Sequence, residues 1–151
     1  MPIGGILELL LVDATNLGGD RDFVGEMDPY VYFEYKNQKL RSNVARGQGA
    51  NPVWNEKFSH WVQYPEEDDQ YILTIRVMDK DKFSRDDSVG QTMIDVRDLV
   101  ALGVEKGMAT VGPCRYSVVG ANGTRSGEIQ VGFTFKPKML ECGPGSRAWG
   151  A

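Results

Sequence analysis

The sequence has few of the residues from which zinc sites and many catalytic sites are built. It contains two cysteines, Cys114 and Cys142, and one histidine, His60. A zinc site of the standard kind needs a cluster of cysteine and histidine ligands, so this composition excludes it. No nucleophile elbow, phosphate-binding loop or dinucleotide fingerprint occurs. We therefore expect a protein that is not an enzyme.

The sequence also lacks a basic excess and a long apolar run. It has 17 Lys and Arg residues against 21 Asp and Glu residues, which counts against general nucleic-acid binding. The apolar stretch near the N-terminus contains Glu8, has no basic flank and continues into Asp13, so it is neither a signal peptide nor a membrane span. We expect a cytoplasmic protein with reduced thiols, and a disulfide between the two cysteines is the alternative.

Alternation of apolar and polar residues dominates the chain. In the run from Ile129 to Phe135 the odd positions are apolar and the even positions are small or polar. This period places the apolar residues on one face of a strand, where they pack against a second layer. Short strands with regular turn signals indicate an all-β antiparallel sandwich. We expect strands at 6–13, 29–35, 38–44, 54–62, 71–79, 88–95, 115–119 and 127–135.

Two segments depart from this alternation. Between Asp95 and Gly103 the apolar residues recur at helical spacing, so we expect a short helix near 95–103 with Asp95 as its N-cap and Gly103 as its stop. From Pro137 onward the sequence has no periodicity. We therefore expect one domain over 1–136 and a flexible C-terminal tail over 137–151.

Aspartates concentrate in two segments that both follow predicted strands, one from Asp22 to Asp28 and one from Asp79 to Asp87. Calcium binds several hard oxygen ligands, and adjacent acidic loops repel each other unless a cation neutralises them. Aspartate is also common in loops because its side chain caps turns. No EF-hand loop is present. Spacing alone therefore indicates acidic loops, with or without a metal ion.

Three motifs occur in a fixed order along residues 5–135. They are Asp22-x-x-Gly25-x-x-Asp28-Pro29-Tyr30-Val31, Asn51-Pro52-Val53-Trp54-Asn55-Glu56-x-Phe58 and Val77-Met78-Asp79-x-Asp81-x-x-x-x-x-Asp87-x-x-Gly90. Together they resemble the C2 domain, and among its members the small single-domain plant proteins described as elicitor-responsive or phloem C2 proteins. The resemblance implies an eight-stranded antiparallel C2 β-sandwich. It also implies type II topology, because the last strand would otherwise have come first.

The resemblance further implies a calcium site formed by two loops. Its carboxylate ligands would be Asp22, Asp28, Asp79, Asp81 and Asp87, and its backbone carbonyl ligands would be Phe23 and Lys80. About two Ca²⁺ ions are expected. Asp86 is expected to be peripheral.

Calcium in such a site would promote binding to an anionic phospholipid membrane. Five carboxylates contribute about −5, and two calcium ions bring this to about −1, so repulsion from an anionic leaflet turns into attraction. The expected result is peripheral recruitment from the cytoplasm to the plasma membrane. An alternative for Phe23 is that its ring folds back onto the sandwich. The expected membrane contacts are Phe23, Val24, Lys82, Phe83 and Arg85.

A second basic surface is expected on the strand that carries Lys39 and Arg41, with Lys36 in the preceding turn. In the family the corresponding sheet face can bind phosphoinositide headgroups. The alternative is a strand edge that its charges protect from pairing with other strands.

These observations predict a calcium-dependent phospholipid-binding module that acts in plant signalling or defence. We expect a monomer, and a protein partner stays open. The alternative is a calcium-independent protein- or RNA-interaction module of the same fold, although the acidic balance counts against RNA.

Overall fold

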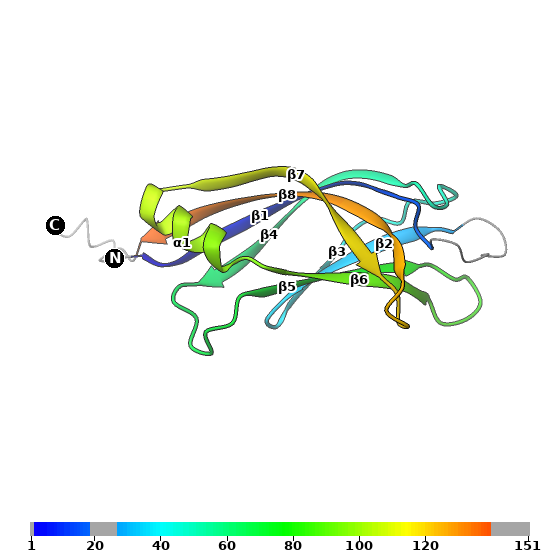
Figure 1. Cartoon of the computed structure of the whole chain (residues 1–151), viewed down its shortest axis with the longest axis horizontal. Helices are drawn as coiled ribbons and strands as arrows, with labels where there is room; N and C mark the ends of the chain where they lie inside the picture. Colours follow the sequence, from blue (N-terminus) through cyan, green and yellow to red (C-terminus); the bar gives the residue numbers. More distant parts are fainter. Residues whose placement is uncertain (1, 19–26, 140–151) are drawn as a thin grey trace.

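Most of the described chain is β-strand. The computed structural model describes residues 2–18 and 27–139 (Figure 1). Each of the eight predicted strands is present, and one short helix follows the sixth strand. The elements are β1 (Pro2–Thr15), β2 (Pro29–Tyr35), β3 (Gln38–Arg41), β4 (Val53–Gln63), β5 (Ile72–Asp79), β6 (Asp87–Asp95), α1 (Arg97–Lys106), β7 (Ala109–Val119) and β8 (Arg125–Met139).

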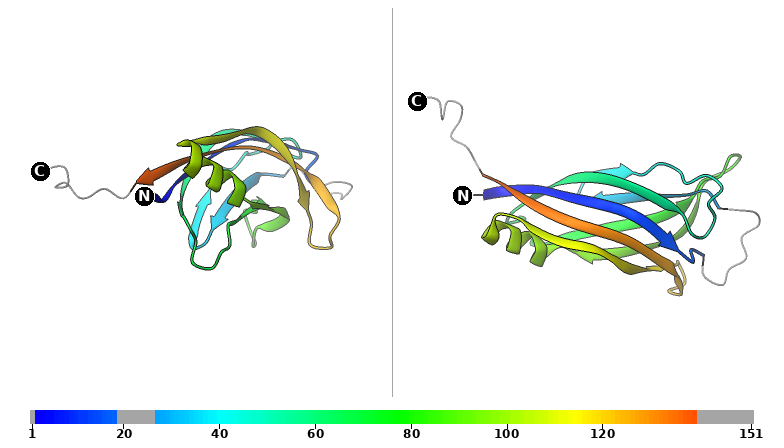
Figure 2. Two further views of the ribbon diagram at one scale, coloured as in Figure 1. Left: turned by 60° about the vertical axis from the view of Figure 1, so that its left-hand side comes forward. Right: turned by 90° about the horizontal axis from the view of Figure 1, so that it is seen from above.

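The strands form two layers. All pairings are antiparallel, in the order β3-β2-β5-β6-β7-β8-β1-β4. In the described chain, β6 and β7 are joined by a single residue pair, Gln91 and Val119, and the sheet folds over at this seam (Figure 2). The last strand lies between β7 and β1, which confirms the predicted type II connectivity. The molecule is therefore the predicted antiparallel sandwich.

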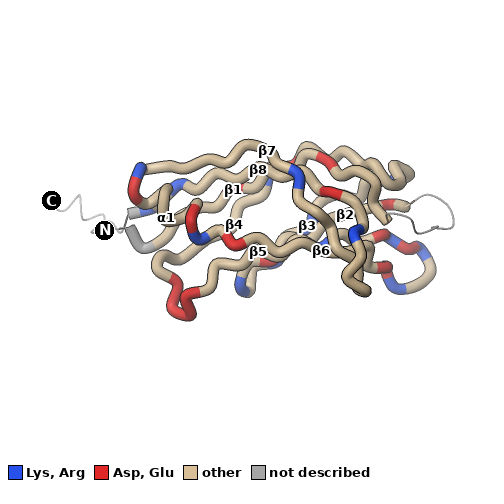
Figure 3. The backbone as a smooth tube through the Cα atoms, viewed as in Figure 1, with Lys and Arg blue, Asp and Glu red and all other residues tan. Residues whose placement is uncertain are grey.

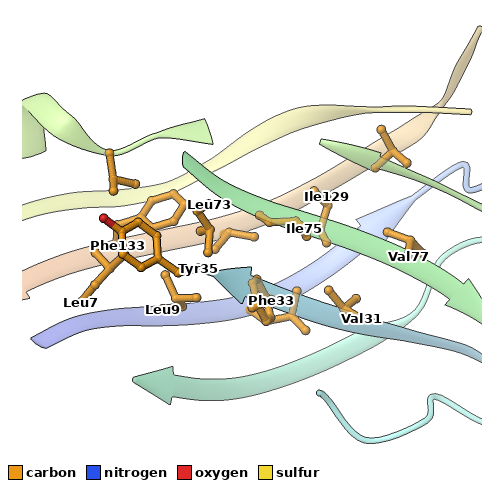
Figure 4. Packing of buried hydrophobic residues seen from close by; sticks show 14 of the residues in the cluster. Leu7, Leu9, Val31, Phe33, Tyr35, Leu73, Ile75, Val77, Ile129 and Phe133 are labelled. Atoms are coloured by element: carbon orange, nitrogen blue, oxygen red, sulfur yellow. The ribbon is translucent and has the colours of Figure 1, made fainter. Parts of the chain in front are cut away.

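Alternating apolar residues build the core between the layers. Leu7, Leu9 and Leu11 of β1 are fully buried. Figure 4 shows Leu7 and Leu9 facing the apolar positions of β2 and β5 across the interior. The predicted inward positions of β8, from Ile129 to Phe135, are buried as well. Burying each such side chain contributes about 1.5–3 kcal/mol, so the period-two pattern fixes which face of each strand is internal.

At the margin opposite the seam, a side chain links the two layers. The carboxamide Nε2 of Gln38 on β3 donates to the backbone oxygen of Trp61 on β4 at 2.6 Å. The backbone N–H of Trp61 donates to Oε1 of Gln38 at 2.7 Å. The Gln38 amide therefore takes the place of a peptide group of a neighbouring strand.

Helix α1 corrects two details of the prediction. Asp95 accepts a hydrogen bond from the Arg97 N–H at 2.9 Å, but the N-cap position is Val96, which makes no side-chain cap bond. Gly103 does not end the helix. A Cβ at Gly103 would lie 2.7 Å from the ring of Phe135, so the glycine allows close packing on β8. The helix ends at Lys106, and the next residue, Gly107, caps it with a φ of 91°, in the left-handed conformation that glycine adopts readily.

Several strand bounds differ from the prediction, most of all in β1, β3, β7 and β8. β1 spans Pro2–Thr15 rather than 6–13, and β3 ends at Arg41 rather than at 44. β7 begins at Ala109 rather than at 115, because Thr110 and Val111 pair with Thr134 and Phe133 of β8. β8 continues to Met139, past the boundary expected after residue 136. The remainder of the expected tail, 140–151, lies outside the described residues and includes Cys142.

Candidate functional site

Three strand ends bring aspartates together at one end of the sandwich. Asp28 directly precedes β2, Asp79 ends β5 and Asp87 begins β6. In the strand register Pro29 lies opposite Asp79, and Asp79 lies opposite Asp87. Figure 3 shows acidic and basic residues alternating along the loop between β5 and β6, at the end opposite to α1. The predicted ligands Asp28, Asp79 and Asp87 are therefore neighbours in space.

Hydrogen bonds tie Asp28 to the end of β5. The Asp28 N–H donates to Oδ1 of Asp79 at 2.9 Å, and the Lys80 N–H donates to the backbone oxygen of Asp28 at 3.0 Å. Oδ1 of Asp28 accepts the N–H of Gly47 at 2.6 Å, which brings the loop between β3 and β4 to the same place. Three connections of the chain therefore meet around Asp28.

The Asp79 carboxyl lies where negative charge accumulates. Burial raises its pKa above the ordinary value. The negative charges of Asp28, Asp87 and Asp81 raise this pKa further, whereas the hydrogen bond from the Asp28 N–H acts in the opposite direction. Such a position favours any bound positive charge that offsets the repulsion.

Asp81 also organises its own loop. Its Oδ1 accepts the backbone N–H groups of Phe83 at 2.9 Å and Ser84 at 3.3 Å. These bonds, the one from Phe83 first, lower the pKa of the Asp81 carboxyl. The phenyl ring of Phe83 is 95% exposed. The loop thus presents an apolar ring beside the acidic group.

Asp86 is bound by three protein groups. Its Oδ1 accepts the Asp81 N–H at 2.9 Å, and its Oδ2 accepts the Tyr30 hydroxyl. The ammonium group of Lys80 lies 3.7 Å from the same Oδ2. The Asp81 N–H lowers the pKa of Asp86 most, and the Tyr30 hydroxyl and the Lys80 ammonium add to that lowering. The charge of Asp86 is therefore already offset by hydrogen-bond donors and an ammonium group of the protein itself.

The donor chemistry of this end suits calcium, because carboxylate oxygens are the ligands that this ion prefers. Within residues 2–18 and 27–139, however, no three His, Cys, Asp or Glu residues are grouped closely enough to hold a metal ion. The expected ligands Asp22 and Phe23 lie outside the described residues, as does Val24. The described residues therefore include only part of the predicted set of calcium ligands.

Each residue of the predicted basic surface lies over a tyrosine ring of β2. The ammonium of Lys39 lies 4.1 Å from the ring centre of Tyr32, and the guanidinium of Arg41 lies 4.5 Å from that of Tyr30. The ammonium of Lys36 lies 5.9 Å from the ring centre of Tyr35, and it also pairs with Asp68, in the loop between β4 and β5, at 2.6 Å.

Sequence reasoning missed one residue at this end, Tyr30. It lies within the Asp-Pro-Tyr motif, where its apolar ring suggested only a strand position. Its hydroxyl reaches Asp86, 56 positions further along the chain. Only the pairing of β2 with β5 brings the two residues together, so no local signal could have identified the contact.

Two further features bear on earlier expectations. The thiol of Cys114 is exposed on β7, 3.3 Å from the backbone oxygen of Gly112. Across the part of the chain that the structure describes, no helix has the length and apolar content of a membrane span.

Comparison with known proteins identifies the family. The model of the C2 domain matches residues 5–111. The chain is similar to Elicitor-responsive protein 1 of Oryza sativa subsp. japonica, with 46% identity over 134 residues that cover 87% of this chain and 84% of the relative. It is similar to 16 kDa phloem protein 1 of Arabidopsis thaliana, with 39% identity over 132 residues and the same two coverages, 87% and 84%. A solved C2 domain-containing protein from an elicitor-responsive gene superposes with a TM-score of 0.73 at 35% identity, covering 94% of this chain and 96% of that one. The chain belongs to the C2 domain family.

Proposed function

We propose that the protein binds anionic phospholipid membranes when calcium occupies the aspartate end of the sandwich. The observation that carries this proposal is the position of Asp79. Its carboxyl is partly buried, which raises its pKa, and three neighbouring negative charges raise that pKa further. A divalent cation relieves that repulsion better than a proton does, because it neutralises several carboxylates at once.

The proposed ligands come from both acidic segments. Asp28, Asp79, Asp81 and Asp87 lie at the ends of β2, β5 and β6 or in the loop that follows β5. Asp22 and the carbonyls of Phe23 and Lys80 complete the set that the family resemblance implies, for about two ions. When bound, calcium supplies positive charge to which lipid phosphate oxygens can bind.

Membrane contact is proposed through the loop between β5 and β6. The ring of Phe83 is 95% exposed, and Lys82 and Arg85 beside it are exposed too. Inserting such a ring into the headgroup region would contribute about 1.5–3 kcal/mol to the free energy of membrane binding through its apolar area. The positive charges of Lys82 and Arg85 would attract anionic lipid. Phe23 and Val24 are proposed as further contacts.

Lys39 and Arg41 are proposed to bind a phosphorylated headgroup. Each lies over a tyrosine ring, which holds the cation in place through a cation–π contact. Lys36 is proposed as a third contact. Its ammonium lies 5.9 Å from the ring centre of Tyr35 and pairs with Asp68, whose side chain is 58% exposed. An exposed ion pair of this kind is weak, so a headgroup phosphate can replace Asp68 as the partner of Lys36.

The proposed role is binding without catalysis. We place the protein in the cytoplasm as a monomer that calcium recruits peripherally to the plasma membrane. A role in plant signalling or defence is inferred from the names of the elicitor-responsive relatives.

Liposome co-sedimentation tests the proposal. The protein should sediment with phosphatidylserine vesicles in calcium and remain in the supernatant in chelator, because only bound calcium reverses the local charge. Asp79→Asn/Asp81→Asn should abolish the calcium-dependent fraction. Asp98→Asn/Glu105→Gln, two exposed acids of α1 at the opposite end of the sandwich, is the matched control and should sediment like the wild type.

Sedimentation that ignores both calcium and the Asp79→Asn/Asp81→Asn change would contradict the proposal. It would favour the calcium-independent interaction module instead, and binding to protein or RNA would then be assayed in chelator.

A further inference from the structure

Asp86 and Asp87 are adjacent acids with different surroundings. Asp87 begins β6 opposite Asp79 and faces the acidic group. Asp86 has a side chain that is 18% exposed, and both of its oxygens accept hydrogen bonds from the protein. The family resemblance makes Asp87 a ligand and leaves Asp86 peripheral, and the contacts of Asp86 show which protein groups hold it.

The Tyr30 hydroxyl has a fixed position. Its residue is only 2% exposed, its ring meets that of Tyr32 edge-on at 5.5 Å, and the Arg41 guanidinium covers one face at 4.5 Å. The backbone of Tyr30 lies opposite Met78 in the pairing of β2 with β5. A buried ring on a paired strand has few rotamers available, so the hydroxyl is a rigid anchor for Asp86.

From this anchor the contacts continue into the loop. Oδ2 of Asp86 is held by Tyr30, and its Oδ1 accepts the N–H of Asp81 at 2.9 Å. The residues between Asp81 and Asp86 are thereby closed into a ring at their base. The bonds from Asp81 to Phe83 and Ser84 then order the tip of the loop.

We propose that Tyr30 and Asp86 form a latch that positions the loop between β5 and β6 for cation binding, and that Asp86 itself is not a ligand. The effect of the latch on calcium binding rests on the proposed function, whereas the contact between Tyr30 and Asp86 exists without the ion. Tyr30 is thus a positioning residue. A loop that is ordered in advance loses less conformational entropy when it binds an ion, so the latch strengthens calcium binding without touching calcium.

The first test compares two tyrosine hydroxyls on the same strand. Tyr30→Phe removes the bond to Asp86, and Tyr35→Phe removes the hydroxyl of another buried tyrosine, which donates to Glu66 at 2.7 Å at the other end of β2. In chelator, amide exchange of Asp81, followed by NMR, should accelerate in Tyr30→Phe only. By calorimetry, Tyr30→Phe should bind calcium about three- to tenfold more weakly with an unchanged number of ions. Unchanged exchange and affinity in Tyr30→Phe would overturn the latch.

The second test separates the adjacent acids. Asp87→Asn should lower the number of bound calcium ions or abolish binding, whereas Asp86→Asn should keep the number and weaken the affinity as Tyr30→Phe does. Loss of an ion in Asp86→Asn would make Asp86 a ligand and overturn the proposal. A wild-type protein that binds no calcium would refute the proposed function, while the exchange of the Asp81 amide would still decide whether the latch exists.

Discussion

At the scale of single residues, His60 is one of two described side chains with a buried nitrogen that has no hydrogen-bond partner, the other being Trp54. The His60 side chain is 1% exposed, its Nε2 donates to the backbone oxygen of Phe33 at 3.2 Å, and its Nδ1 has no partner among the described residues. Burial lowers the pKa of this imidazole below 6.5, and the bond to Phe33 opposes that lowering. The folded protein therefore holds His60 neutral.

This burial predicts an acid-sensitive stability. Because the pKa of His60 is lower in the folded state than in the unfolded state, its contribution is complete above pH 6.5 and is lost as the pH falls from there through the folded pKa. The urea midpoint, measured in chelator, should decline between about pH 7 and about pH 5.5. His60→Gln should show a flatter profile over this range. Equal slopes in the two proteins would contradict the assignment.

Residue-scale contacts also show what sequence reasoning could and could not supply at the candidate site. The acidic segments were visible in the sequence, and Asp28, Asp79 and Asp87 do lie together. The motif match already made Asp87 a ligand and left Asp86 peripheral, but the partner that holds Asp86 could not be predicted, because Tyr30 comes from a distant strand. The contact of Lys36 with Asp68 was hidden for the same reason, since it depends on a loop from elsewhere in the chain.

At the scale of elements, alternation predicted the strands because burial of one face acts on every second residue. The helix was predicted at nearly the right place, but its end was not. Glycine commonly ends a helix, but Gly103 lies inside α1, where its missing side chain lets the helix pack closely against the ring of Phe135 on β8. A glycine that permits close packing and one that ends a helix look alike until the layers are assembled.

The packing of α1 on β8 yields a second prediction. Gly103→Ala places a methyl group 2.7 Å from the Phe135 ring and 3.2 Å from its backbone oxygen. Either the helix or the ring must move, so the free energy of unfolding should fall by about 1–3 kcal/mol. Gly112→Ala, where nothing lies within 4 Å of the added Cβ, is the control and should change little. Urea denaturation measures the free energy of unfolding of both variants. Equal values for Gly103→Ala and Gly112→Ala would contradict the prediction, because they would show that the helix can shift without a loss of stability.

At the scale of the whole molecule, calcium should stabilise the fold. An ion that binds the assembled carboxylates and not the unfolded chain adds about 2.7 kcal/mol at a hundredfold excess over its Kd. Thermal unfolding should therefore shift upward in calcium relative to chelator. Asp79→Asn should show little of this shift. In chelator the variant should be at least as stable as the wild type, since the substitution removes a charge from a repulsive group and leaves an amide oxygen that can still accept the Asp28 N–H.

If calcium raised the unfolding temperature of Asp79→Asn as much as that of the wild type, the ion would have to bind at another place in the molecule. Magnesium serves as the ionic-strength control, because it demands a tighter octahedral shell than open loops provide.

The amide of Gln38 has a consequence for how molecules behave when they crowd together. An open strand margin is a template on which a neighbouring chain can add a strand, and proteins gathered on a bilayer meet at high local density. Because the Gln38 side chain already binds the backbone N–H and carbonyl of Trp61, these groups cannot pair with a strand of another molecule at this point of the margin. Under the proposed function, molecules that crowd on a bilayer would therefore stay separate at this margin instead of joining edge to edge.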